Sequence, residues 1–144
     1  MLCSIVSNSQ IASVYMINIE EFRKNPDNQN WENISCHQKL SEEFIREFQH
    51  KVKWRIVSYY QTLSESFIRE FQDKVDWYII SYKQKLSEEF IREFQDKVSW
   101  MNISYKQKLS KEFIGEFYQK INFKKLLNNK DISNEVKEFC RMFL

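Results

Sequence analysis

Apolar residues recur along this chain with a period of 23 residues, and the polar residues between them repeat as well. Four successive copies share the pattern W-x-x-[IV]-S-x-x-Q-x-L-S-x-x-F-I-x-E-F-x-x-K-[VI], and they begin at Trp31, Trp54, Trp77 and Trp100. A fixed period of this length is typical of a solenoid, whose units are too small to bury their own apolar faces and become stable by stacking on their neighbours. The pattern therefore predicts a stacked array of repeats.

The second half of each unit predicts an α-helix. In LSEEFIREFQDKV the serine is able to cap a helix, acidic residues usually follow it, and a lysine lies near the end, as the helix dipole prefers. The leucine before the serine is placed to pack on the isoleucine at the fourth helical position, as a hydrophobic staple. In the third copy the apolar stripe is Phe90, Ile91, Phe94 and Val98. We expect a helix after each of Ser41, Ser64, Ser87 and Ser110.

The first half of each unit, WYIISYKQ in the third copy, is aromatic and β-branched and so also suits a strand. Its spacing favours a helix, with matching positions at Trp77, Ile80, Ser81 and Gln84. Residues able to cap a helix precede three of the units, namely Asp76, Ser99 and Asn122. Lys53, which precedes Trp54, breaks that pattern. We interpret the recurring serine as a small residue that permits close helix contact, and the recurring glutamine as a partner for backbone groups at the tight corner.

The whole pattern predicts an all-α protein, a right-handed α-solenoid of short two-helix repeats. We expect the tryptophans to anchor the first helix of each unit, the LSEEFIREFQDKV segments to stack the array, and the tryptophan-bearing helices to present its face. A leucine-rich repeat is the alternative, but the Asn or Cys of its motif is absent and its spacing slips by one residue. A continuous coiled coil is disfavoured because seven-residue apolar spacing is not sustained.

The two ends of the chain diverge from the array, as terminal repeats usually do. Residues 1–30 are interpreted as an N-terminal capping segment, in which Glu20, Glu21 and Phe22 echo the EEF of the array and a loop is expected near Pro26. Residues 31–122 form the four tandem repeats. Residues 123–144 form a degenerate C-terminal repeat.

Composition agrees with an ordered chain, since 42% of the 144 residues are hydrophobic and 29% are charged. One Gly and one Pro argue against a turn-rich β protein and against a disordered linker. The net charge of +2, from 22 Lys and Arg against 20 Asp and Glu, is too balanced for a protein that grips phosphate backbones over a broad face.

The sequence predicts a cytoplasmic protein. No segment approaches the roughly 18 apolar residues of a membrane span, and the N-terminus has no basic start followed by an apolar region. The cysteines Cys3, Cys36 and Cys140 are odd in number and scattered, which indicates free thiols in a reducing compartment.

No group of residues predicts catalysis, a metal or a cofactor. Adjacent glutamates such as Glu88 and Glu89 lie in a first helical turn, where solvated charges are expected more often than a tuned acid and base. A single glycine excludes the usual phosphate-cradling loops, and the histidines and cysteines lack metal-ligand spacing. We therefore expect a protein that is not an enzyme.

The residues that differ among the copies gather on the first predicted helix, where a partner-facing surface varies most freely. Drift on a solvent face explains the same observation. The alternative is an aromatic and basic stripe of the kind enriched at protein interfaces, made of Arg55, Tyr59, Tyr60, Tyr78, Tyr82, Lys83, Tyr105 and Lys106. This interpretation predicts a non-catalytic scaffold that binds a protein partner.

Two other functions stay open. A modular reader of single-stranded nucleic acid would stack bases on tyrosines at constant spacing, although the lysine and arginine density is low for binding phosphates. A self-assembling protein would stack end to end through the apolar residues of the last repeat, Phe139, Met142, Phe143 and Leu144.

The phrase YKQKLSEEFIREFQDKV with its flanking tryptophan resembles short repeats in proteins of giant DNA viruses and some large phages. The likeness covers residues 31–122. It implies a repeat scaffold of unassigned role, with no catalytic residues to carry over. It also implies a viral interaction protein that meets host factors in the host cytoplasm.

Overall fold

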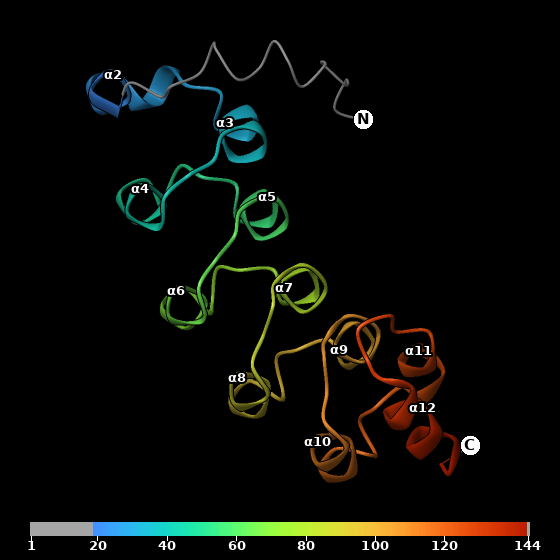
Figure 1. Cartoon of the computed structure of the whole chain (residues 1–144). Coiled ribbons are helices and arrows are strands. Elements are labelled where there is room, and N and C mark those ends of the chain that lie inside the picture. The colour runs from blue at the N-terminus through green and yellow to red at the C-terminus, as the bar shows by residue number, and fades with distance from the viewer. Residues whose placement is uncertain (1–18, 144) are drawn as a thin grey trace. The chain divides into compact units, whose positions relative to one another are not determined.

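The computed structural model of the protein describes residues 19–143, and every regular element in that range is a helix. The chain divides into two compact units, residues 1–53 and residues 54–144. Figure 1 labels the helices of each unit. None of the described helices is both long and apolar enough to span a lipid bilayer.

The first unit contains the helices α2 (Ile19–Lys24), η1 (Pro26–Asn28), α3 (Trp31–His37) and α4 (Glu42–Glu47). The loop expected near Pro26 is therefore a short 3₁₀ helix. Arg23 donates to Glu47 at 2.8 Å, and Lys51 binds Asp27. These pairs have the 24-residue separation of the ion pairs between later repeats, so α2 and η1 act as the second half of a repeat that precedes Trp31.

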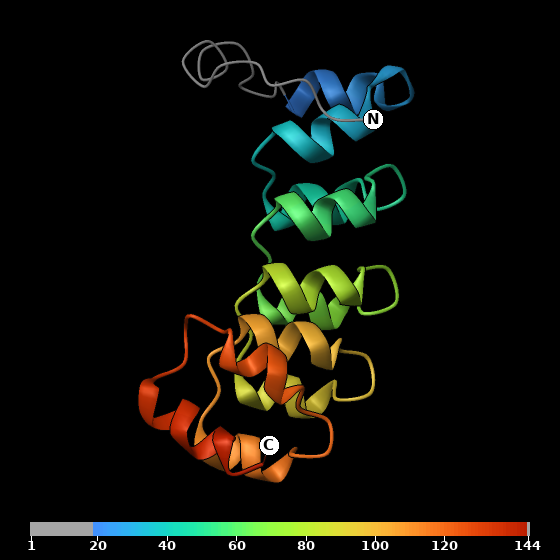
Figure 2. The ribbon, with the colours of Figure 1, turned by 90° about the vertical axis from the view of Figure 1, so that its right-hand side faces the viewer.

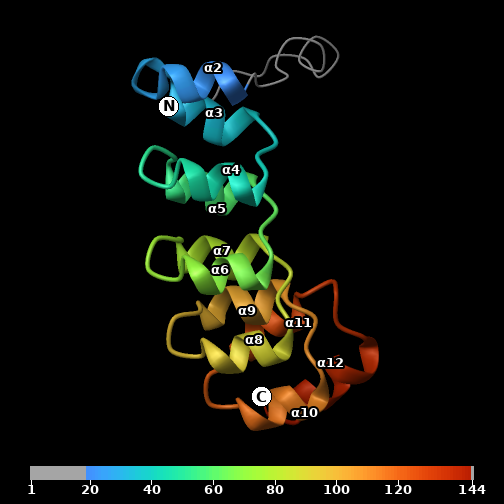
Figure 3. The ribbon, with the colours of Figure 1, turned by 90° about the vertical axis from the view of Figure 1, so that its left-hand side faces the viewer.

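The second unit is a stack of four two-helix repeats. Its elements are α5 (Trp54–Tyr60), α6 (Glu65–Glu70), α7 (Trp77–Lys83), α8 (Glu88–Glu93), α9 (Trp100–Lys106), α10 (Lys111–Glu116), α11 (Phe123–Leu127) and α12 (Asn134–Arg141). The tryptophan-bearing helices α5, α7 and α9, with α11, form one layer, and we call them the first helices (Figure 2). The others, the second helices, form the other layer (Figure 3). The all-α solenoid of two-helix repeats is thus confirmed.

The predicted caps explain where most helices begin. Ser87 accepts a hydrogen bond from the Phe90 backbone N–H at 3.2 Å, and the corresponding serines of the other repeats do the same. Asp76 and Asn122 cap first helices through their side chains. Ser99 stands at a cap position, but its side chain makes no capping bond.

The second helices are shorter than the apolar stripe predicts. Helix α8 ends at Glu93, and Phe94 then accepts from the backbone N–H groups of Lys97 and Val98 at 2.9 and 3.0 Å. The chain turns there, so Val98 reaches the core from a turn rather than from the helix.

The core lies between the two layers. Phe67, Phe90 and Phe113 are almost fully buried, as are the isoleucines that follow them. Burying a side chain of this size stabilises the fold by about 1.5–3 kcal/mol. Trp77 packs on Phe94 with ring centroids 4.9 Å apart, and its indole N–H donates to the Gln72 carbonyl at 2.8 Å. The predicted anchoring role of the tryptophans matches this geometry.

The recurring serine fixes the start of the next first helix. Ser81 is fully buried, and its hydroxyl donates to the Trp77 carbonyl at 2.6 Å. The same oxygen accepts from the Ser99 backbone N–H at 2.9 Å. The expected small contact residue is therefore also a hydrogen-bonding bridge between adjacent repeats.

The recurring glutamine satisfies the end of the preceding first helix. Gln107 donates to the carbonyls of Ser81 and Gln84 at 3.0 and 2.8 Å, and accepts from the Leu86 backbone N–H at 3.1 Å. These carbonyls lie at a helix end, where no intrahelical partner remains. The predicted role at a tight corner is correct, but the corner belongs to the neighbouring repeat.

The expected division of labour between the two segments needs correction. The backbones that approach most closely are those of successive first helices, α5 with α7, α7 with α9 and α9 with α11. A fully buried serine at their contact allows this approach. The tryptophan-bearing helices therefore stack the array as well as presenting its face.

Candidate interaction surface

The residues of the predicted stripe all lie on the first helices of the second unit. In the repeats that begin with α5, α7 and α9, the fourth, fifth and eighth positions, such as Ile80, Ser81 and Gln84, are buried. The second and sixth positions, such as Tyr78 and Tyr82, are one helical turn apart and face outward together. Tyr78 is 57% exposed and Tyr82 38% exposed.

Tyrosines and lysines from successive repeats lie against one another on this face. Lys83 Nζ is 4.2 Å from the centroid of the Tyr59 ring in the preceding repeat. Lys106 Nζ is 4.7 Å from the Tyr82 ring and 4.8 Å from the Tyr105 ring. Cations at this range are attracted by the negative face of an aromatic ring.

The same arrangement continues to the last repeat. Lys125 Nζ is 5.7 Å from the centroid of the Tyr105 ring, and the Tyr82 and Tyr105 rings are stacked with centroids 6.5 Å apart. We call the complete set the tyrosine–lysine ladder, which consists of Tyr59, Tyr82, Lys83, Tyr105, Lys106 and Lys125.

Three residues of the predicted stripe lie outside the ladder. Arg55 forms an ion pair with Asp76, with Nη1 3.3 Å from Oδ2, so its charge is directed to a helix cap of the next repeat. Tyr60 packs on Tyr59 at 4.8 Å. Tyr78 is exposed, and its backbone carbonyl accepts from Asn102 Nδ2 at 2.9 Å.

Sequence comparison among the copies missed one ladder member, Lys125. Lys125 belongs to the divergent repeat, where the aligned residue of the fourth copy is Asn102. Asn102 is buried and donates to the Tyr78 carbonyl of the preceding repeat, whereas Lys125 at the same position of the repeat is exposed. The lysine-rich phrase FKKLL was the available signal for Lys125.

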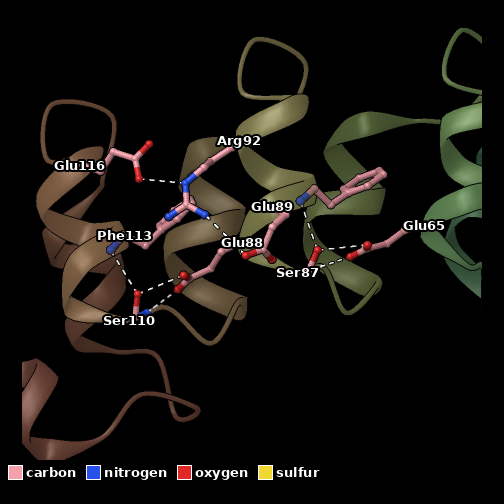
Figure 4. A network of polar contacts seen from close by, with 9 residues as sticks. Glu65, Ser87, Glu88, Glu89, Arg92, Ser110, Phe113 and Glu116 are labelled. Carbon is pink, nitrogen blue, oxygen red and sulfur yellow. Dashed lines mark hydrogen bonds and ion pairs between the residues drawn. The ribbon is translucent and has the colours of Figure 1, made fainter.

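The arginines on the second helices pair with carboxylates, in contrast to the lysines of the ladder. Arg92 Nε lies 2.8 Å from Glu116, and Glu88 accepts from the Ser110 backbone N–H at 2.6 Å (Figure 4). Arg69 holds Glu93 through two nitrogens, and this hydrogen bonding lowers the pKa of the Glu93 carboxyl. The arginines of the second layer thus have carboxylates of their own.

Lys97 and Lys120, in the turns after second helices, are paired too. Lys97 is 3.1 Å from Asp73, and Lys120 is 3.4 Å from Asp96. Within the described residues, Lys83, Lys106 and Lys125 have no carboxylate partner. The ladder is therefore a line of three unneutralised cations set among aromatic rings.

Two hollows lie beside the last repeats. One, of about 210 Å³, adjoins the ladder and is lined by Tyr105, Lys106, Asn128, Lys130 and Asp131. The other, of about 370 Å³, is mainly apolar, and its walls include Leu86, Leu109, Ile132 and Val136. Val136 stands where the earlier repeats have phenylalanine, which leaves more space at this junction.

Three of the four residues predicted for self-association, Phe139, Met142 and Phe143, lie within the described part of the chain. Phe143 stacks on Phe123 at 5.1 Å and lies edge-on to Phe139 at 5.3 Å, so these rings contact each other within one chain. Met142 is 79% exposed. Leu144 lies outside the described residues.

The remaining chemistry-bearing side chains are few. Cys140 is buried, and burial raises the pKa of its thiol, while Cys36 is partly buried. Neither of these two cysteines forms a disulfide bond, and Cys3 lies outside the described residues. Among the described residues, no group of histidine, cysteine and carboxylate side chains is placed to hold a metal ion.

Comparison with protein-family models, curated proteins and solved structures gives no match for this chain.

Proposed function

We propose that the protein is a non-catalytic repeat scaffold that binds a protein partner through the tyrosine–lysine ladder. The observation that carries this proposal is the contrast in charge pairing between the layers. Arg69, Arg92 and Lys97 are neutralised by carboxylates of adjacent repeats, whereas the ladder lysines are not. Partly exposed tyrosines lie beside those lysines, and tyrosine is among the residues enriched at protein interfaces.

The rigid spacing of the ladder also suits recognition. The first helices α5, α7 and α9 are each fixed by a buried serine and by a glutamine or asparagine of the next repeat, so their ladder side chains project from a firm base. A surface held in place before binding loses less conformational entropy when a partner arrives. Tyrosine and lysine on such a base fit the role of anchors.

The test is comparative capture of partners from an expressing cell. Tyr82→Ala with Tyr105→Ala removes two ladder rings, and Tyr78→Ala with Tyr118→Ala removes two exposed tyrosines outside the ladder. Quantitative mass spectrometry should find proteins that the wild type and the Tyr78/Tyr118 variant retain and the Tyr82/Tyr105 variant loses. Binding of such a protein should then be reproduced with purified components.

Far-ultraviolet circular dichroism would check that both variants keep the helical content of the wild type. Equal losses of the captured proteins in the two variants, or no loss in either, would contradict the proposal. Removal of Tyr59 as well, in a triple variant with Tyr82→Ala and Tyr105→Ala, should abolish binding altogether.

A further inference from the structure

The surface contact that joins the third repeat to the fourth is weaker between the fourth and the fifth. At the earlier junction, Glu88 accepts from the backbone N–H and the hydroxyl of Ser110 at 2.6 and 3.1 Å (Figure 4). Lys111 stands at the next equivalent position, so no carboxylate is placed there to accept from Ser133. An ion pair of Lys111 with Glu135 at the surface takes its place, and such pairs contribute little to stability.

The buried side of the last junction also lacks a hydrogen bond. In the fourth repeat, the amide oxygen of Gln107 accepts from the Leu86 backbone N–H at 3.1 Å. Asn129 keeps the two donated bonds of the glutamine, but its amide oxygen accepts from Asp131 of its own repeat at 2.8 Å. Within the described residues, the backbone N–H of the buried Leu109 has no hydrogen-bond partner. Leaving such a group unpaired weakens the junction.

The indole hydrogen bond of the earlier repeats is missing at this junction as well. Trp100 donates its indole N–H to the Gln95 carbonyl of the preceding repeat at 2.8 Å, and Trp77 forms the same bond with Gln72. Phe123 occupies the tryptophan position of the fifth repeat and has no side-chain donor. The two hollows described above adjoin the same repeat, so packing is reduced there together with hydrogen bonding.

The two helices of the fifth repeat, in contrast, hold closely to each other. Within the second unit, α11 and α12 are the two helices of one repeat whose backbones approach each other most closely, whereas the other close approaches join successive first helices. Phe143 of the last turn also stacks on Phe123 of α11. In a solenoid, stability is the sum of contributions from single repeats and from their junctions. A cohesive repeat on a weak junction should therefore move as one cooperative unit.

We propose that the fifth repeat opens from the folded array as one unit, α11 and α12 leaving together while residues 54–122 stay folded. Opening separates Lys125 from the Tyr105 ring, 5.7 Å away in the closed state, and so breaks the tyrosine–lysine ladder at this end. A partner that contacts both residues binds the closed state and stabilises it. The opening belongs to the free protein, and only this coupling to a partner rests on the proposed function.

Amide hydrogen exchange of the full chain, followed by NMR under conditions in which the exchange rate reports the opening equilibrium, tests the proposal. The hydrogen-bonded amides of α11 and α12 should share one protection factor, at least about tenfold below those of α9 and α10. Low concentrations of urea should lower the protection of both helices equally, because both exchange through one opening. No partner is needed, so this result is independent of whether the proposed function is correct.

A variant of the junction shows whether its contacts control the opening. Lys111→Glu places at the last junction the glutamate that contacts Ser110 at the preceding one. Its carboxylate should accept from the Ser133 backbone N–H and raise the protection of both helices about fivefold. Lys85→Glu makes the same change of charge at an exposed position of the third repeat, and should change the protection of α11 and α12 less than about twofold.

Several results would overturn the inference. Equal protection of the helices from α9 to α12 would mean that the fifth repeat opens only when the whole array unfolds. Low protection of α12 alone, with α11 as protected as α9, would mean that the C-terminal helix frays by itself. Equal responses to Lys111→Glu and Lys85→Glu would mean that the contacts of the junction do not control the opening.

Discussion

The junction between the third and fourth repeats and the junction between the fourth and fifth hold together in the same way in the interior and differently on the surface. At the first, Gln107 donates to the carbonyls of Ser81 and Gln84. At the second, Asn129 donates to the carbonyls of Ser104 and Gln107 at 3.0 and 2.8 Å. The shorter side chain of Asn129 thus forms the hydrogen bonds that correspond to those of Gln107. The first helix of its repeat, α11, is also shorter than the others.

The surface contacts at the two junctions are not preserved. Glu88 holds both the backbone N–H and the hydroxyl of Ser110, but Lys111 stands at the next equivalent position and contacts Glu135 instead. Arg92 pairs with Glu116, whereas Gly115 occupies the next arginine position.

This difference agrees with the free energies that the buried and the exposed contacts contribute. A buried backbone group left unpaired costs about 1–3 kcal/mol, while an exposed ion pair contributes about 0–1 kcal/mol. At the last junction, the exposed ion pairs, which contribute little free energy, have been replaced. The buried amide–carbonyl hydrogen bonds, whose loss would cost more, have been kept. The same ranking orders the expected effects of mutation.

The largest effect should follow removal of the buried amides. Gln107→Leu leaves two helix-end carbonyls and the Leu86 backbone N–H without their partner, which should destabilise the protein by about 3 kcal/mol in urea unfolding. Asn129→Leu should cost about 2–3 kcal/mol, because it uncovers two equivalent carbonyls.

The control for both is Gln119→Leu, which removes an exposed amide that donates only to the Tyr118 hydroxyl. Its effect should stay within about 0.5 kcal/mol. If Asn129→Leu were as mild as this control, the two junctions would not share an interior device, and the comparison would fail.

The next largest effect should come from the bridging serines. Ser81→Ala and Ser104→Ala each remove the acceptor of a backbone N–H, that of Ser99 or Asn122, at 2.9 Å. Each should lower the free energy of unfolding by about 1–2 kcal/mol. Ser66→Ala is the matched control, because its exposed hydroxyl shares a hydrogen bond with the Ser64 hydroxyl and with no backbone group, and its effect should stay within about 0.5 kcal/mol. Unequal costs at Ser81 and Ser104 would show that the last junction is built differently inside.

A smaller effect of opposite sign is expected at the surface of the fourth repeat. Gly115 lies inside helix α10, and a Cβ added there would meet nothing within 4 Å. Gly115→Ala should therefore stabilise the protein by about 0.5–1 kcal/mol, by restricting the unfolded chain.

Gly115→Arg tests whether an arginine at this position would form an ion pair across the last junction. The ion pairs of Arg69 and Arg92 reach a glutamate 24 residues later, but the residue at that distance from Gly115 is Phe139. The arginine should stabilise no more than the alanine does. A clear extra gain in thermal unfolding would mean that surface pairing still operates at the last junction.

The sequence was sufficient to predict the two-helix repeat because each helix carries its own cap and stripe. Ser87 and Asp76 mark helix starts through side chains that hydrogen-bond locally, and local bonds can be inferred from spacing. The early end of α8 could not be inferred, because Val98 has helical spacing from Phe94 yet reaches the core from a turn.

The candidate surface was predicted in part for a similar reason. Tyr82 and Lys106 lie at outward positions that the helical period specifies, but their contact joins two repeats and depends on how the repeats stack. Arg55 has the right residue type, yet Asp76 of the next repeat takes its charge. Asn129 was not foreseen as a substitute for glutamine, since the fifth repeat places it one residue earlier than the period requires.

The smallest expected effect is a loss of stability at acidic pH. Hydrogen bonding and charge attraction from Arg69 lower the pKa of Glu93 below its ordinary value of 4.5, and Lys111 does the same for Glu135 at the last junction. A carboxyl with a lowered folded-state pKa stabilises the fold fully above its unfolded pKa, and this contribution is lost as the pH falls through the folded value. Stability should therefore begin to fall below about pH 4.5 on account of both pairs.

Urea unfolding of Glu93→Gln and Glu135→Gln between pH 6 and pH 3 would compare the two junctions. Each variant should be less stable than the wild type at pH 6, and the gap should narrow toward pH 3 as the pH falls through the lowered folded-state pKa of the wild-type carboxyl. Glu93 should show the wider gap, since Arg69 donates to both of its oxygens and Lys111 offers a single ammonium group. Glu112→Gln, at an exposed carboxylate, controls for net charge. A gap at Glu135 as wide as that at Glu93 would show that the last repeat has replaced its lost arginine contact with an equal one.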